Sequence, residues 1–106
     1  MANYNTDPHD IKKNTITFAE LYEEWSARKF EKIQSSTQDT YNLCFKKSKA
    51  LHNLPFKDIK TEHLQKIIDA NKELTMIRQF KYLYNQLYKF AIKYDIDKNH
   101  AQYLEL

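Results

Sequence analysis

The sequence predicts a small all-α domain, a bundle of four main helices, and three observations support this prediction. Apolar residues recur at helical spacing in four segments, whereas no segment alternates with the period of two that a half-buried strand requires. The 106 residues include no glycine, which disfavours folds that depend on glycine-rich phosphate loops or tight hairpin turns. The length fits one domain with a modest core.

Composition narrows the class of protein further. A single cysteine, Cys44, allows no internal disulfide bond, which excludes a disulfide-stabilised secreted scaffold. No apolar run approaches the roughly 18 residues of a membrane span, and the N-terminus lacks the apolar segment of a signal peptide. We therefore expect a soluble, cytoplasmic protein without membrane contact. The net charge is +3, and the basic excess follows Gln34, with twelve Lys and Arg against eight Asp and Glu.

The first predicted helix begins at a capping signal. Residues 1–16 are polar, contain Pro8 and show no sustained apolar period, so we expect a flexible tail or linker there. Thr17 and Glu20 have the spacing of a capping box, in which each side chain bonds the backbone N–H of the other residue. The helix is predicted to run to about Ile33. Its apolar face consists of Phe18, Leu21, Tyr22, Trp25 and Ile33.

Two further helices are predicted in the middle of the chain. Ser36 and Asp39 form a short-armed variant of the capping box after a serine-rich break, and a helix over about 37–51 follows. Pro55 marks a loop whose apolar residues we expect to plug the core, and the next helix covers about 62–71. The residues expected in the core from these segments are Tyr41, Cys44, Phe45, Ser48, Leu54, Phe56, Ile59, Leu64, Ile67 and Ile68.

The last predicted helix, about 76–94 with Thr75 as its cap, has two chemically different sides. No acidic residue occurs from Leu74 to Tyr94. Arginine and asparagine can make bidentate contacts with guanine and adenine, and lysine suits phosphates, although a basic helix face with no partner is an equally weighted alternative. The core side carries Phe80, Leu83, Tyr84, Leu87, Ala91 and Tyr94. The opposite side, within about 80° on the helical wheel, carries Arg78, Tyr82, Asn85, Lys89 and Lys93.

The serine-rich segment before the second helix also has two interpretations. Ser35, Ser36 and Thr37 fit a plain N-cap, which needs no ligand. Their hydroxyl and backbone N–H groups at the positive end of a helix dipole also suit a phosphate group. The two roles are compatible, so both stay open.

No catalytic or metal site is predicted. The histidines, His9, His52, His63 and His100, are scattered, and none pairs with Cys44 at ligand spacing. The thiol of Cys44 falls on the apolar side of its helix, without a base to activate it. We therefore expect no cofactor, no metal ion and no small-molecule substrate.

Four segments carry a family resemblance through their order along the chain. They are TFAELYEEW from Thr17, SSTQDTYNLCFK from Ser35, LPFKDIKTEHLQKII from Leu54 and QLYKFAIKYDIDKN from Gln86. This succession, over residues 17–99, resembles the core-binding domain of tyrosine recombinases, especially the integrases of phages and conjugative transposons. The resemblance implies a SAM-like bundle of four main helices. Such a domain clamps one face of the crossover-site double-stranded DNA while a separate catalytic domain clamps the other.

The same resemblance implies that this chain is not itself an enzyme. The family's catalytic pattern requires two arginines, a lysine, a His-x-x-Arg element and a tyrosine nucleophile. Only Arg28 and Arg78 are arginines, and no histidine is followed three places later by one. We expect residues 100–106 to begin a linker to an absent catalytic domain, although Asn99-His100 stands where family members commonly have Asn-Pro. The fragment is expected to be monomeric, and the parent recombinase tetrameric on DNA.

The resemblance and the helical wheel together place the DNA contacts on two helices. A helical protein-interaction domain is the main alternative, and an exposed apolar patch would favour it. A helix-turn-helix regulator is another, which the short spacing 71–75 permits. The predicted DNA-binding residues are Ser35, Ser36, Thr37, Thr40, Lys46, Lys47, Thr75, Arg78, Gln79, Lys81, Tyr82, Asn85 and Lys89.

Overall fold

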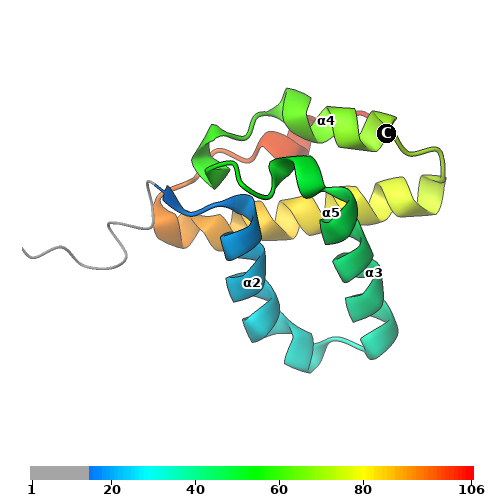
Figure 1. Cartoon of the computed structure of the whole chain (residues 1–106), viewed down its shortest axis with the longest axis horizontal. Coiled ribbons are helices and arrows are strands. Elements are labelled where there is room, and N and C mark those ends of the chain that lie inside the picture. Colours follow the sequence, from blue (N-terminus) through cyan, green and yellow to red (C-terminus); the bar gives the residue numbers. More distant parts are fainter. Residues whose placement is uncertain (1–14) are drawn as a thin grey trace, which may run out of the picture.

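The structure, a computed structural model, describes residues 15–106 and consists of helices and short turns (Figure 1). Within this range no strand forms, and a single isolated antiparallel bridge joins Thr17 and Pro55. The prediction of an all-α bundle with four main helices is confirmed. The predicted tail lies outside the described residues up to position 14. The main helices are α2 Phe18–Lys29, α3 Ser35–Lys47, α4 Thr61–Asp69 and α5 Leu74–Ala91, and the 3-10 turns are η1 Phe30–Lys32, η2 Lys49–Leu51, η3 Phe56–Asp58, η4 Ile92–Tyr94 and η5 His100–Tyr103.

The start of α2 confirms the predicted capping box. The backbone N–H of Glu20 donates to Thr17 Oγ1 over 3.2 Å, and the N–H of Thr17 donates to Glu20 Oε1 over 2.9 Å. These two bonds satisfy N–H groups that the first helical turn would otherwise leave without partners. The segment before the helix is held as well, because the N–H of Phe56 donates to the carbonyl of Ile16 over 2.8 Å.

The junction between α2 and α3 differs from the prediction. The first helix ends at Lys29 rather than near Ile33, and the chain tightens into η1. The side chain of Gln38 then donates to the carbonyls of Phe30 and Ile33, both over 2.7 Å. These bonds close the turn and let α3 begin at Ser35, so the predicted cap at Ser36 and start at position 37 are wrong.

The ends of the later helices also shift. The second helix stops at Lys47 and gives way to η2, instead of continuing to Leu51. The predicted cap at Thr75 is wrong, because α5 begins at Leu74 after Glu73 and no side chain caps it. The end of α5 changes to the 3-10 turn η4, after which Asp95 adopts a left-handed conformation with φ 62°. That conformation turns the chain back along α5.

The long helix α5 organises the fold (Figure 1). Both α2 and α3 contact α5 and project from the same side of it, joined at their far ends by η1. The C-terminal turn η5 contacts both α5 and α4. None of the helices in residues 15–106 combines the length and the apolar character needed to cross a bilayer.

Aromatic packing around Phe18 forms the centre of the core. Its ring centroid lies 5.9–6.1 Å from the rings of Phe45, His52, Phe56 and Tyr84. These residues come from α2, α3, the following loop and α5, so one ring joins most of the bundle. The predicted core residues are buried or half-buried, including the loop plug of Leu54, Phe56 and Ile59.

Packing extends beyond residues 17–99 at both ends. Ile16 is buried, and so are Ala101 and Leu104 in the segment that was expected to begin a linker. The hydroxyl of Thr61 donates to the carbonyl of His100 over 2.9 Å, which ties the segment to α4. The packed core therefore runs from Ile16 to Leu104.

Cys44 is fully buried on the core side of α3, as the sequence predicted. Burial raises the pKa of the Cys44 thiol to about 11, an effect that the nearby Lys47 opposes. At pH 8 the thiolate is then on the order of one molecule in a thousand. We expect a thiol reagent such as DTNB to label native protein very slowly and urea-unfolded protein at once. Rapid labelling of the native protein would show that Cys44 is accessible.

Candidate nucleic-acid interface

A row of exposed side chains on α5, the α5 ridge, is the first part of the candidate interface. It consists of Arg78, Tyr82 and Lys89, all exposed and separated by four and seven residues. This spacing places them on one side of the helix. No acidic residue occurs within α5, so no carboxylate of its own neutralises the ridge.

The ring of Tyr82 stacks on the ring of Tyr41, which is itself supported by Trp25. The centroids of the Tyr82 and Tyr41 rings lie 6.0 Å apart, with 13° between their planes. Tyr41 in turn packs edge-on against Trp25 at 5.6 Å. Tyr82 still has 53% of its surface exposed. An exposed ring with fixed orientation can pack against a flat or apolar ligand surface at little entropic cost.

A hollow on one side of the α5 ridge forms the second part, which we call the α2–α5 groove. Its volume is about 490 Å³. The contributing side chains combine three ammonium groups with aromatic and aliphatic surface. They are Trp25 and Lys29 from α2, Gln86, Lys89 and Phe90 from α5, and Ile92 and Lys93 from η4.

The lysines of the groove differ in their partners. The ammonium of Lys93 lies 3.8 Å from Glu24 Oε1 and 4.5 Å from the centre of the Phe90 ring. The same carboxylate accepts a hydrogen bond from Tyr94. Among residues 15–106, neither Lys29 nor Lys89 has a carboxylate within 4.0 Å. The groove therefore presents positive charge that internal ion pairs leave largely uncompensated.

Asn85, on the other side of the ridge, is engaged inside the protein. Its Nδ2 donates to the carbonyl of Lys81 over 2.8 Å, and its Oδ1 accepts from Asn99 Nδ2 over 2.8 Å. Asn99 Oδ1 accepts in turn from the N–H of Ala101 over 2.8 Å. The predicted base contact of Asn85 stays a prediction, and such a contact would have to replace these bonds.

The other residues predicted on α5 lie at the margins of the ridge. Thr75 is exposed at the beginning of the helix, whereas Gln79 and Lys81 are half-buried on opposite flanks. The ridge and its margins therefore bring together the α5 residues that the sequence singled out, with Asn85 as the internally bonded one.

The residues predicted on α3 divide between two faces. Ser36, Thr40 and Lys47 follow one another at spacings of four and seven, and the hydroxyl of Thr40 donates to the carbonyl of Ser36 over 3.1 Å. Ser35 and Lys46, eleven residues apart, lie on a different face of the helix. Thr37 is half-buried on the far side of the first row, away from Ser35 and Lys46. The six predicted residues are therefore spread over about 200° of the helix circumference, and only Ser36, Thr40 and Lys47 form a continuous row.

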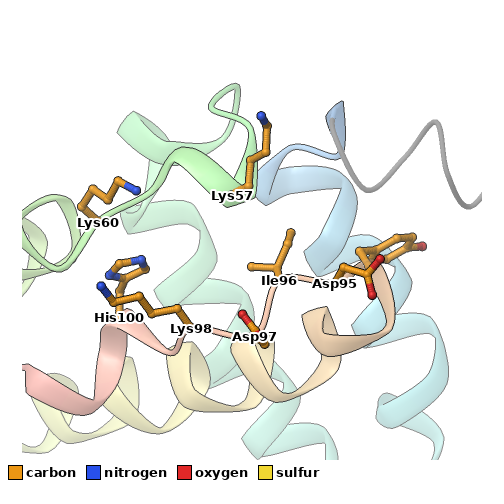
Figure 2. Close-up of a pocket in the computed structure, with 8 residues that line it drawn as sticks. Lys57, Lys60, Asp95, Ile96, Asp97, Lys98 and His100 are labelled. Atoms are coloured by element: carbon orange, nitrogen blue, oxygen red, sulfur yellow. The ribbon is translucent and has the colours of Figure 1, made fainter.

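A separate cavity of about 310 Å³ lies between η3 and the C-terminal segment (Figure 2). Lys60, Lys98 and His100 gather at one end of it, while Asp95 and Asp97 lie toward the other. Burial lowers the pKa of His100, and the neighbouring Lys60 and Lys98 lower it further. Because its charges are mixed, this cavity does not favour anions as the α2–α5 groove does.

Comparison with known protein families identifies the domain. A family model described as phage integrase, N-terminal SAM-like domain, matches residues 17–70. The chain belongs to the phage integrase family. This match supports the N-terminal domain of a tyrosine recombinase, so the resemblance seen in the sequence is confirmed. No curated protein and no solved structure gives a significant match to the chain.

Sequence reasoning missed Lys29 and Gln86 as members of this integrase domain's candidate interface. Lys29 comes from α2, the helix with more acidic than basic residues in its neighbourhood, and no pattern along that helix distinguishes it from other surface lysines. Gln86 lies beside the predicted face of α5 on the helical wheel and was not among the predicted contacts. Only the crossing of α2 and α5 brings Lys29, Gln86 and Lys89 around one hollow.

Among residues 15–106 no group of three or more His, Cys, Asp or Glu side chains is arranged to hold a metal ion. The candidate interface of this integrase domain is built from cationic, amide and aromatic side chains. Groups of this kind bind anionic and planar partners by hydrogen bonds, charge and stacking.

Proposed function

We propose that this integrase domain binds double-stranded DNA and clamps the crossover site for a catalytic domain elsewhere in the parent recombinase. The observation that carries the proposal is the α5 ridge, an exposed row of Arg78, Tyr82 and Lys89 on a helix that has no acidic residue of its own. The affinity of proteins for DNA comes largely from neutralised phosphates, and sequence preference comes from side chains that reach base edges.

Each residue of the ridge has its own expected role. The guanidinium of Arg78 can pair bidentately with O6 and N7 of guanine in the major groove, while Lys89 contacts a phosphate as a point charge. Tyr82 packs against a sugar or a thymine methyl. The stripe of Ser36, Thr40 and Lys47 on α3 is proposed to meet the adjacent backbone. Ser35, Thr37, Lys46, Thr75, Gln79 and Lys81 are proposed as supporting contacts of lower weight.

In this proposal the domain acts without chemistry of its own. Cys44 is buried, and the family's catalytic set cannot be assembled from this chain. We propose that the isolated domain is monomeric and intracellular, and that assembly into a tetramer belongs to the complete recombinase. Its affinity for DNA should be low, because single modules have small interfaces.

A helix-turn-helix regulator is the weaker alternative. Four residues, 70–73, connect α4 and α5, which is the right length for such a motif. In Figure 1, however, the two helices run in roughly opposite directions, whereas a helix-turn-helix crosses at about 90–120°. A protein-interaction role finds some support in Ile92, which is exposed beside the groove.

The decisive experiment is a titration of labelled duplex DNA with the chain at several salt concentrations. Lys89→Ala should weaken binding to all sequences alike and make the logarithmic salt slope shallower by about one unit. Arg78→Ala should reduce the preference among randomised duplexes by about 1–3 kcal/mol.

Lys66→Ala is the matched control, because Lys66 is exposed on α4 and its replacement removes the same single positive charge. It should bind DNA like the wild type. The proposal fails if the wild type shows no salt-dependent binding, or if all three variants bind alike while their thermal melts are unchanged.

A further inference from the structure

The α2–α5 groove has a combination of features that the ridge alone does not explain. Lys29 and Lys89 approach it from two different helices and have no carboxylate partner within 4.0 Å in residues 15–106. Lys93 is held in place on its margin by Glu24 and by the ring of Phe90. Lys93 is compensated by Glu24, whereas the charges of Lys29 and Lys89 favour an anion in the hollow that both of them line.

We propose that the α2–α5 groove is a binding site for one phosphodiester of the DNA backbone, with the attached deoxyribose packed on the apolar lining. This inference rests on the proposed function and adds Lys29, Gln86 and Lys93 to the contacts. The amide of Gln86 supplies a neutral donor between the lysines, as phosphate oxygens often receive in protein–DNA complexes.

Distances along α5 agree with this placement. Arg78 and Lys89 are eleven residues apart, which corresponds to about 16 Å along the helix axis. The major groove of B-DNA is about 12 Å wide. If the beginning of α5 places Arg78 against base edges, the end of the helix lies beyond the groove, at the phosphate strand that borders it. The α2–α5 groove lies at that end.

The chemistry of the lining favours a sugar-phosphate over a bare phosphate ion. A volume of about 490 Å³ exceeds what one small anion fills. Trp25, Phe90 and Ile92 give the hollow apolar surface against which a deoxyribose ring can pack. The charged and apolar parts of one nucleotide therefore match the two parts of the groove.

Lys29→Ala tests the inference, with Lys32→Ala as its matched control. Both lysines are exposed, they lie three residues apart near the α2–α3 turn, and only Lys29 lines the groove. The measurement is a fluorescence-anisotropy titration of a short duplex of arbitrary sequence, because phosphate contacts do not depend on sequence. Lys29→Ala should weaken binding about fivefold at roughly 0.15 M salt, the effect of one counterion release, and should reduce the salt slope by about one unit.

The outcomes separate this inference from the function on which it rests. Suppose that Lys29→Ala binds DNA with the affinity and salt slope of the wild type, while Lys89→Ala loses affinity as expected. This result would overturn the proposed phosphate site and leave DNA binding by the ridge intact. Such a result would favour an acidic protein segment as the occupant of the groove. An equal loss for Lys32→Ala would show a diffuse effect of charge and would also overturn it. No binding by the wild type would end both proposals.

Discussion

Replacement of Phe18 by alanine is expected to lower the free energy of unfolding by about 3–5 kcal/mol. The fully buried ring of Phe18 contacts four other rings, from α3, the following loop and α5. Removing it leaves a cavity that no single neighbour can fill, since each of those rings is fixed by its own helix or loop. A loss of this size is a large fraction of the stability of a small domain.

Urea denaturation and thermal melting of the complete chain would measure this loss. A domain of this size shifts its melting temperature by about 4–8 °C for each kcal/mol, so the change should be unmistakable. Leu43→Ala is the control, because Leu43 is 44% exposed on α3 and should cost much less. Equal stability of the two variants would contradict the central position of Phe18.

Replacement of Leu104 by alanine is expected to cost about 2–5 kcal/mol, although the residue lies close to the C-terminal end of the sequence. Leu104 is buried, and the segment around it is bonded to α4. Gln65 donates to the carbonyl of Glu105 over 2.8 Å and accepts from the N–H of Glu105 over 2.9 Å. The side chain of Leu104 therefore anchors the C-terminal segment to the domain.

Tyr103→Ala provides the adjacent control, since 63% of Tyr103 is exposed and its loss should change stability by no more than about 0.5 kcal/mol. Hydrogen exchange of the Glu105 amide should also rise in Leu104→Ala and not in Tyr103→Ala. Identical melts for both variants would show that residues 100–104 do not pack on the domain in solution.

Features encoded locally could be predicted from the sequence. The capping box of Thr17 and Glu20 and the apolar stripe of α5 each depend on residues within a few turns of one helix, and both are confirmed. The start of α3 was predicted at the wrong residue because three consecutive hydroxyl side chains offered similar capping signals. The side chain of Gln38, which bonds carbonyls of the preceding turn, decided the outcome.

The candidate site was predictable only as far as one helix extends. The helical wheel placed Arg78, Tyr82 and Lys89 together, because their relation depends on helical geometry alone. It could not show that Asn85 is bonded to Asn99, fourteen residues later, or that Lys29 approaches Lys89 from another helix. Those relations depend on how the chain turns after Asp95 and on where α2 crosses α5.

The bonded series from Asn85 through Asn99 to Ala101 sets the direction of the chain after the bundle. The side-chain amide of Asn99 bonds α5 through its Nδ2 and the η5 turn through its Oδ1. The C-terminal segment is therefore held on one side of α5. A shift of α5 would therefore displace the C-terminal segment with it.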